Sequence, residues 1–142
     1  MDKQTLDEMN QKVLDDFRAN GGVVGGQFEG MPVLLLHHTG AKSGTVRINP
    51  LVYSMDGDTY VIICSKGGAP KNPDWYYNLI THPETKIEVG TETVPVTVSE
   101  ATGAERRRLY DQQVEIMPFF ADYEKAAAPH REIPVLVLTP RG

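Results

Sequence analysis

The apolar residues near the start of the chain recur with the period of an α-helix. Those between residues 5 and 18 follow an i, i+3, i+4, i+7 spacing. They are Leu6, Met9, Val13, Leu14 and Phe17. The opposite face is acidic, whereas helices that lie on membrane surfaces usually carry lysine and arginine there. The pattern predicts an amphipathic helix packed on the body of the domain, with at most peripheral membrane contact.

A glycine-rich segment, residues 20–26, follows this helix. A dinucleotide-binding fingerprint needs its glycines after a strand and before a helix, and here the order is reversed. We therefore interpret the segment as a flexible connector that has room to approach a ligand.

Six short apolar runs carry the signals of β-strands. They cover residues 31–39, 45–55 with an interruption at Pro50, 59–64, 85–89, 93–99 and 133–139. Most are joined by tight turns, which favour antiparallel pairing over a doubly wound parallel sheet, and closure of a sheet removes exposed edges. We therefore expect an α+β fold, mainly β, in which a small antiparallel barrel has helices packed outside it.

Three further helices are predicted from their start signals. At residues 72–74, Asn72 is expected as the N-cap, followed by proline at the first helical position and an acid in the first turn. Thr102 and Glu105 form a capping box that opens a helix through residue 117. A short helical piece over residues 119–127 follows a proline.

The charge of the chain is distributed unevenly. The 142 residues suit one domain, and their formal net charge of −5 argues against nucleic acid as a partner, because phosphate backbones need a broad basic face. Residues 31–55 and 59–73 nevertheless contain neither Asp nor Glu. These two basic windows in an acidic protein predict a local site for an anionic small molecule.

Several residue types narrow the chemistry. Cys64 is the only cysteine, so neither a disulfide nor a thiolate metal site is expected, and a buried position suits it better than a nucleophilic role. His37 and His38 are neighbours on a predicted strand and point to opposite faces, so they cannot chelate one metal ion. At least one of them is expected to be buried and hydrogen-bonded. No apolar run reaches the length of a membrane span, and we expect a cytoplasmic protein without a metal.

The first acid-free window contains a glycine-flanked loop, residues 40–47. Backbone N–H groups that face outward in such a loop bind phosphate or carboxylate. Lys42 adds a point charge, Ser43 a hydroxyl donor and Arg47 a bidentate fork suited to carboxylates. A solvated hairpin turn with basic edges is the alternative interpretation of this loop taken alone.

The second window contains a Lys-Gly-Gly loop, residues 65–68, between a buried strand and the start of a helix. Helix N-termini attract anions, and Trp75 and Tyr76 offer flat apolar walls, although each alone is equally typical of a core. Two such loops favour a ligand with a ring at one end and phosphate at the other. Because the chain has no recognisable acid–base set, a bound cofactor is expected to carry the chemistry.

The order and spacing of these motifs closely resemble the deazaflavin-dependent nitroreductase family of actinobacteria. The resemblance extends from about residue 30 to the last strand and is carried by residues 38–44, 47–51, 65–69 and 72–79. It implies a split β-barrel of the FMN-binding type over residues 30–142, preceded by a helix and connector over residues 1–29. It also implies the 8-hydroxy-5-deazaflavin coenzyme F420.

The resemblance further implies which residues hold the coenzyme. Lys42, Ser43 and Arg47 would bind its polyglutamate tail, and the loop at residues 65–67 would border its ring and phosphate. The implied coenzyme-binding residues are Ala41, Lys42, Ser43, Gly44, Arg47, Pro50, Ile63, Cys64, Ser65, Lys66, Gly67, Gly68, Trp75, Tyr76 and Asn78.

The implied reaction is hydride transfer from the reduced coenzyme to an apolar electrophilic acceptor, namely a quinone, an enone or lactone, or a nitroaromatic compound. Ser65 and Tyr123 are the implied catalytic residues, Ser65 as a hydrogen-bond donor and Tyr123 as a proton donor or a lid aromatic. Members that reduce nitroimidazoles are rich in tyrosine where this chain has Met117, Phe120 and Tyr123. Quinones, enones and lactones are therefore the expected acceptors.

Two alternatives stay open. One is an oxidoreductase that binds flavin mononucleotide on the same barrel, and the other is a non-catalytic protein that binds the deazaflavin. The expected partners are small molecules alone, and the expected assembly is a monomer or a homodimer.

Overall fold

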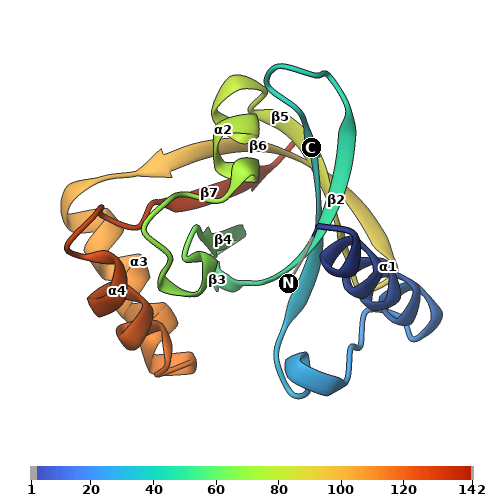
Figure 1. Ribbon diagram of the computed structural model, residues 1–142, viewed down its shortest axis with the longest axis horizontal. Helices are drawn as coiled ribbons and strands as arrows, with labels where there is room; N and C mark the ends of the chain where they lie inside the picture. The colour runs from blue at the N-terminus through green and yellow to red at the C-terminus, as the bar shows by residue number, and fades with distance from the viewer. Residues whose placement is uncertain (1–2, 142) are drawn as a thin grey trace.

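One curled antiparallel sheet forms the centre of the protein (Figure 1). The computed structural model describes the backbone of residues 3–141 and the side chains of residues 8–26 and 28–141. Within them the strand order is β2-β1-β5-β6-β7-β4-β3, and every neighbouring pair is antiparallel. The strands are β1 (Val33–Thr39), β2 (Val46–Val52), β3 (Ser54–Asp56), β4 (Thr59–Ile63), β5 (Glu84–Val89), β6 (Glu92–Ala101) and β7 (Val135–Pro140).

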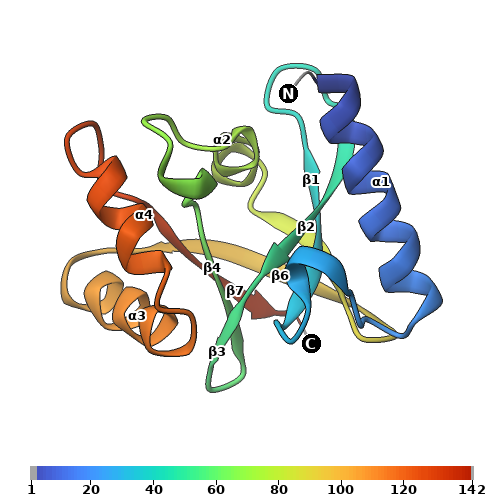
Figure 2. The same ribbon diagram turned by 60° about the horizontal axis from the view of Figure 1, so that its bottom comes forward.

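Helices cover the sheet on several sides. Figures 1 and 2 place α1 at one end of the molecule and the α3–α4 pair at the other. The helical elements of the described chain are α1 (Lys3–Ala19), η1 (Gly26–Phe28), η2 (Lys66–Gly68), α2 (Asp74–Thr81), α3 (Gly103–Ile116) and α4 (Phe120–Ala127), of which η1 and η2 are short 3₁₀ turns.

The two edges of the sheet belong to one continuous stretch of chain. β2 is one edge strand and β3 is the other, and only Tyr53 separates them. β2 pairs with β1 as far as Val52, and β3 pairs with β4 from Ser54 onward. The sheet therefore curls into a half-barrel with its edges meeting at residue 53, which confirms the predicted α+β fold with an antiparallel, barrel-like sheet.

Three apolar clusters fill the spaces between the sheet and the helices. The first occupies the interior of the curl, where Leu34 and Leu36 of β1 meet Trp75 of α2. The second lies between the sheet and the α3–α4 pair. In the third, Phe17 of α1 packs near Leu35 on the other face of β1. Alternate side chains of a strand face opposite ways, so the apolar run at the start of β1 is buried on both faces.

The N-terminal helix packs on the sheet as predicted. Leu14 and Phe17 are buried, whereas Met9 is 43% exposed. The side chain of Leu6 lies outside the described side chains. In the described part of the chain, no helix combines the length and apolarity that a bilayer span requires.

The predicted interruption at Pro50 is wrong. β2 continues through Pro50, which lies opposite Leu35, and the break falls instead at Tyr53. An edge strand tolerates proline because one of its two hydrogen-bonding sides has no neighbouring strand. The described chain consequently has seven strands rather than the expected six.

The predicted cap of α2 is also wrong. Pro73 is the N-cap residue, and the helix begins at Asp74 without a side-chain cap. The side chain of Asn72 is engaged elsewhere, because it accepts a hydrogen bond from Arg131 at 2.9 Å and donates one to Tyr77 at 3.3 Å. At α3 the predicted N-cap, Thr102, is correct in position but makes no capping hydrogen bond.

A carboxylate on β5 connects α1 to the sheet. Glu88 accepts hydrogen bonds from Arg18 at 3.1 and 2.8 Å and lies 2.7 Å from Nε2 of His37. The hydrogen bonds from Arg18, reinforced by the contact with His37, lower the pKa of Glu88 although partial burial opposes them. A carboxyl group whose pKa falls on folding stabilises the protein above its ordinary pKa and loses that contribution as the pH falls through the lowered value.

Glu88→Gln should therefore lower the free energy of unfolding at pH 7 by about 1 kcal/mol, a value reduced because Arg18 is partly exposed. The difference from the wild type should shrink as the pH falls below the ordinary glutamate pKa and disappear below the lowered pKa of the folded state, where the carboxyl group is protonated in both the folded and the unfolded protein. Urea unfolding at several pH values measures it. Glu84→Gln on the same strand is the matched control, since its carboxylate is 71% exposed and 3.8 Å from Arg141. Equal losses in the two variants would contradict the role of Glu88.

Candidate functional site

A cavity of about 530 Å³ opens between the end of β2, the loop after β4, the start of α2 and α4. Cavities of roughly 300 to 1,000 Å³ hold drug-sized ligands, so this one has room for a flat ring system. The lining residues are Phe28, Met31, Pro50, Leu51, Val52, Ile63, Ser65, Lys66, Gly67, Pro73, Trp75, Phe119, Phe120 and Tyr123.

Few polar side chains reach this largely apolar cavity. Ser65 is buried at the start of the loop after β4, Lys66 follows it, and Tyr123 comes from α4. Within the described chain the hydroxyl groups of Ser65 and Tyr123 have no hydrogen-bond partner. Both hydroxyls are therefore available to a ligand in the cavity.

The loop after β4 has an unusual backbone. Lys66 has φ 45°, and it is the one non-glycine residue of the described chain in the left-handed region, where a side chain is strained. Gly67 and Gly68 follow with φ 64° and 84°. Such strain recurs at binding sites, where the surrounding structure maintains it.

Helix α4 fits closely against this loop. A Cβ atom on Gly68 would lie 2.9 Å from Cβ of Ala126 and 3.1 Å from the carbonyl oxygen of Tyr123, so only glycine allows this approach. The rings of Phe119 and Phe120 stack edge-on against Tyr123, with centroids 5.6 and 5.2 Å away. The aromatic wall of the cavity and the strained loop thus form one packed unit.

A buried polar group connects the β1–β2 hairpin to α2. The Asn78 side chain accepts a hydrogen bond from the backbone N–H of Ala41 at 2.9 Å. Its amide nitrogen therefore faces Nδ1 of His38, 3.0 Å away, and donates to it. Nε2 of His38 then carries the proton and donates to Oδ1 of Asn49 at 2.7 Å. This chain of bonds fixes the loop that carries Lys42.

Burial, assisted by the nearby Arg47, lowers the pKa of His38. The ring is thus neutral at pH 7, as its acceptor role at Nδ1 requires. The expectation that one histidine of the pair is buried and hydrogen-bonded is confirmed, since His38 is 3% exposed.

Four cations of the β1–β2 hairpin and the loop after β4 have no acidic partner, and one of them, Lys66, lines the cavity. Among the described residues, the ion pairs of lysine and arginine involve Arg18 of α1, three arginines of α3 and Arg141 near the C-terminus. Lys42, Arg47, Lys66 and Lys71 form none of these pairs. Unpaired cations beside an apolar cavity suit a ligand with a flat ring and an anionic tail.

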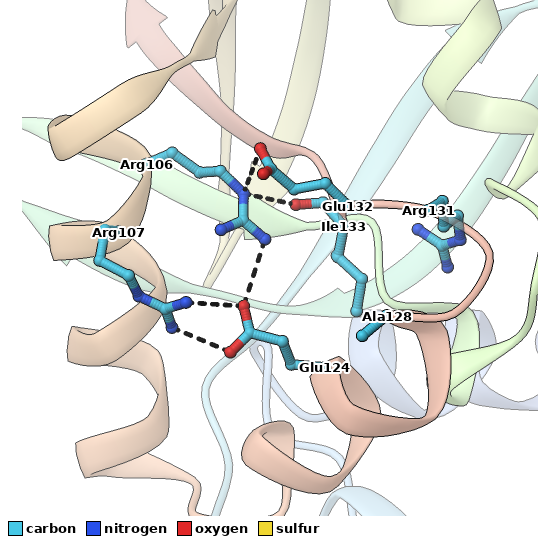
Figure 3. A pocket seen from close by; sticks show the side chains of 7 residues that line it. All are labelled: Arg106, Arg107, Glu124, Ala128, Arg131, Glu132 and Ile133. Atoms are coloured by element: carbon cyan, nitrogen blue, oxygen red, sulfur yellow. Dashed lines mark hydrogen bonds and ion pairs between the residues drawn. The ribbon is translucent and has the colours of Figure 1, made fainter.

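A second cavity, of about 320 Å³, lies between α3, α4 and the segment before β7 (Figure 3). Arg107 pairs with Glu124 at 2.8 Å, and Arg106 lies 3.4 Å from the same carboxylate. Glu124 and Glu132 thus offset the charges of Arg106 and Arg107, and the larger, mostly apolar cavity is the better candidate for binding a flat ring.

The structure divides the predicted site residues into two groups. Those that line the large cavity are Pro50, Ile63, Ser65, Lys66, Gly67, Trp75 and Tyr123. Those outside its lining are Ala41, Lys42, Ser43, Gly44, Arg47, Cys64, Gly68, Tyr76 and Asn78. Their roles toward a coenzyme stay predictions.

Two residues outside the lining have other partners or surroundings. The hydroxyl of Tyr76 donates to Glu100 at 2.7 Å, and partial burial together with this bond raises the pKa of the phenol. Cys64 is buried as predicted, and burial raises the pKa of its thiol well above the usual value, which makes a nucleophilic thiolate unavailable near pH 7.

Sequence reasoning missed several lining residues, among them Phe28 and Met31 near the end of the connector. Phe28 lies between Gly26 and Gly30, and Met31 follows Gly30, so large apolar side chains beside glycines are the available signal for a wall of this kind. The residues with described side chains contain no cluster of His, Cys, Asp or Glu that could hold a metal ion.

A family model described as F420H(2)-dependent quinone reductase matches residues 9–140. Among curated proteins, the chain is 38% identical over 129 residues to an F420H(2)-dependent quinone reductase of Mycobacterium tuberculosis. That alignment covers 88% of this chain and 85% of the relative.

Solved structures include two similar chains. One is titled an F420-H2 dependent reductase, FDR-A, with 36% identity and a TM-score of 0.68, over 75% of this chain and 93% of that one. The other is described as a domain-swapped dimer, with 32% identity and a TM-score of 0.70, over 95% of this chain and 97% of that one. The expected deazaflavin family and its split-barrel fold are confirmed.

Strain at Lys66 leads to a test by paired substitutions. Lys66→Gly should have a free energy of unfolding about 1 kcal/mol higher than Lys66→Ala, because both remove the charge and only glycine relieves the left-handed strain. Lys71→Gly and Lys71→Ala form the control pair, since Lys71 is not in the left-handed region and glycine should be the less stable there. Thermal and urea unfolding of the four variants measure these free energies. If the glycine variant were less stable than the alanine variant at both positions, the result would contradict strain at Lys66.

Proposed function

Because the chain belongs to the F420H(2)-dependent quinone reductase family, we propose that it uses reduced coenzyme F420 to reduce apolar quinones. The observation that supports this most is the combination of one apolar cavity with nearby unpaired cations on two loops. A deazaflavin with a flat ring and an acidic tail matches both features.

The residues present fit the coenzyme. The cavity wall made by Pro50, Ile63 and Trp75 suits a planar ring, and Ser65 offers a free hydroxyl for its polar edge. Lys66 also lines the cavity. Lys42 and Arg47 are exposed on the neighbouring hairpin and are free to bind phosphate or carboxylate groups of the tail.

The bound coenzyme supplies a hydride, and the protein supplies the surroundings for its transfer. The apolar walls exclude water from the reacting atoms. A quinone that gains a hydride also needs one proton to become a hydroquinone, and the unpartnered hydroxyl of Tyr123 is placed to donate it. Tyr123 is half-buried, so solvent can return the proton afterwards.

The cavity also constrains the acceptor. Its aromatic side, formed by Phe119, Phe120 and Tyr123, carries no charged side chain. Apolar ring compounds such as naphthoquinones are thus the favoured substrates, and enones, lactones and nitroaromatic compounds of similar shape extend the proposed range. Met117 is buried outside the cavity lining, and Tyr123 is the one tyrosine that lines the cavity.

The location and assembly of the protein stay predictions. We propose a cytoplasmic enzyme, either a monomer or a homodimer, and a similar solved structure described as a domain-swapped dimer favours testing for the latter. Light scattering of the purified protein measures its mass in solution.

The function is tested by titration and turnover. Oxidised F420 should bind more tightly than flavin mononucleotide, and reduced F420 should be oxidised only when a quinone such as menadione is present. Tighter binding of flavin mononucleotide would favour the flavin alternative. F420 binding without quinone-dependent oxidation would favour a non-catalytic carrier.

The double variant Lys42→Ala/Arg47→Ala should raise the dissociation constant of F420 by about 10- to 100-fold through the loss of charge-assisted hydrogen bonds. The turnover number at saturating coenzyme should stay within about twofold of the wild type, because neither residue lines the cavity. Fluorescence titration and steady-state kinetics measure the two effects. Arg108→Ala/Arg141→Ala is the control, with the same change in net charge away from the cavity, and an equal loss of affinity there would remove the tail-binding role.

A further inference from the structure

Arg131, two residues before the buried Ile133 that leads into β7, directs its whole guanidinium group at the loop after β4. Nε donates to the carbonyl oxygen of Ala69 at 3.0 Å, and Nη2 donates to that of Ser65 at 3.0 Å. Nη1 donates to the carbonyl oxygen of Cys64 at 3.1 Å and to Oδ1 of Asn72 at 2.9 Å. One side chain thus bridges both ends of the segment 64–72.

This guanidinium has no carboxylate partner among the described residues. Figure 3 shows it standing apart from the ion pairs that Arg106 and Arg107 make with Glu124. Neutral oxygens, three from the backbone and one from the Asn72 side-chain amide, therefore hold the group, and its positive charge is not cancelled. A planar fork with five donors can satisfy four acceptors in this way, whereas a lysine ammonium cannot.

The loop needs such an external support. Its internal backbone bonds are the 3₁₀ contacts from Gly68 to Ser65 at 2.9 Å and from Ala69 to Lys66 at 3.1 Å. Between them lie the strained Lys66 and two glycines with positive φ, and glycine lowers the cost of leaving this conformation. Local sequence alone does not maintain such a backbone.

Arg131 is also fixed to α4. Its backbone N–H donates to the carbonyl oxygen of Ala127 at 2.9 Å, in the last turn of that helix. The same helix contacts the loop at Gly68 and supplies Tyr123 to the cavity. The residue therefore joins the two walls between which a ring would lie.

We infer that Arg131 is a positioning residue, which holds the loop 64–72 in its binding conformation and in register with α4. The inference rests on the proposed function where it assigns this loop to the coenzyme. Arg131 does not line the cavity and takes no direct part in the reaction.

The first test uses the protein without coenzyme. Hydrogen–deuterium exchange of Arg131→Lys should be faster than in the wild type over residues 65–72, while exchange in β5 and β6 is unchanged. A purely structural role would speed exchange throughout the domain. Arg107→Lys is the matched control, because Arg107 holds α4 through Glu124 without contacting the loop, and its variant should leave exchange in the loop unaltered.

The second test measures binding and kinetics. Arg131→Lys should raise the dissociation constant of F420, and the KM for reduced F420, by about 10- to 100-fold, which is the range known for residues that orient the ligands of metal sites. The turnover number at saturation should change by no more than about twofold. Asn72→Ala, which removes a single acceptor of the guanidinium, should change both quantities in the same direction by a smaller factor.

The outcomes separate this inference from the proposed function. Unchanged loop exchange and unchanged F420 affinity in Arg131→Lys would overturn the inference while leaving the function intact. Faster loop exchange in a protein whose wild type binds no F420 would support the positioning role and refute the function. A uniform rise of exchange across all strands would also overturn the inference, because it would show a general loss of stability.

Discussion

The two edge strands of the sheet, β2 and β3, are consecutive in the chain, and this constraint creates the cavity. If the β3–β4 pairing continued beyond Ser54, Val52 would lie opposite Ile63. Val52 pairs instead with Val33 of β1, so the ends of β2 and β4 separate. Both Val52 and Ile63 line the cavity. The cavity therefore lies where the ends of β2 and β4 would pair with each other if the barrel were complete.

The charged side chains of the protein divide into structural ion pairs and cations without an acidic partner. Arginines on α1 and α3 are neutralised by acids on β3, β5 and α4, where they hold elements together. The cations of the two acid-free windows have no such partners and stay available. An acidic protein can in this way keep a positive potential at one site, because a short-range field depends on the nearest groups more than on the net charge.

Sequence patterns predicted the features that depend on neighbouring residues in the chain. The apolar run of β1, the positive loops and the buried Cys64 all follow from composition and periodicity. The cap of α2 did not, because Asn72 has the right type and position for a cap but is taken by Arg131, 59 residues away in the chain. The break at Tyr53 was likewise invisible, since it depends on which strand occupies the sheet edge.

The contribution of Arg131 has the same non-local origin, and its chemistry explains why the partner atoms are carbonyl oxygens. A carboxylate in their place would bind the guanidinium equally well and would cancel its charge beside Lys66. Carbonyl groups fix the side chain and also leave the charge in place, so structural support and attraction of an anion do not compete. The strained loop therefore gains its stability from a residue that at the same time adds to the positive potential of the site.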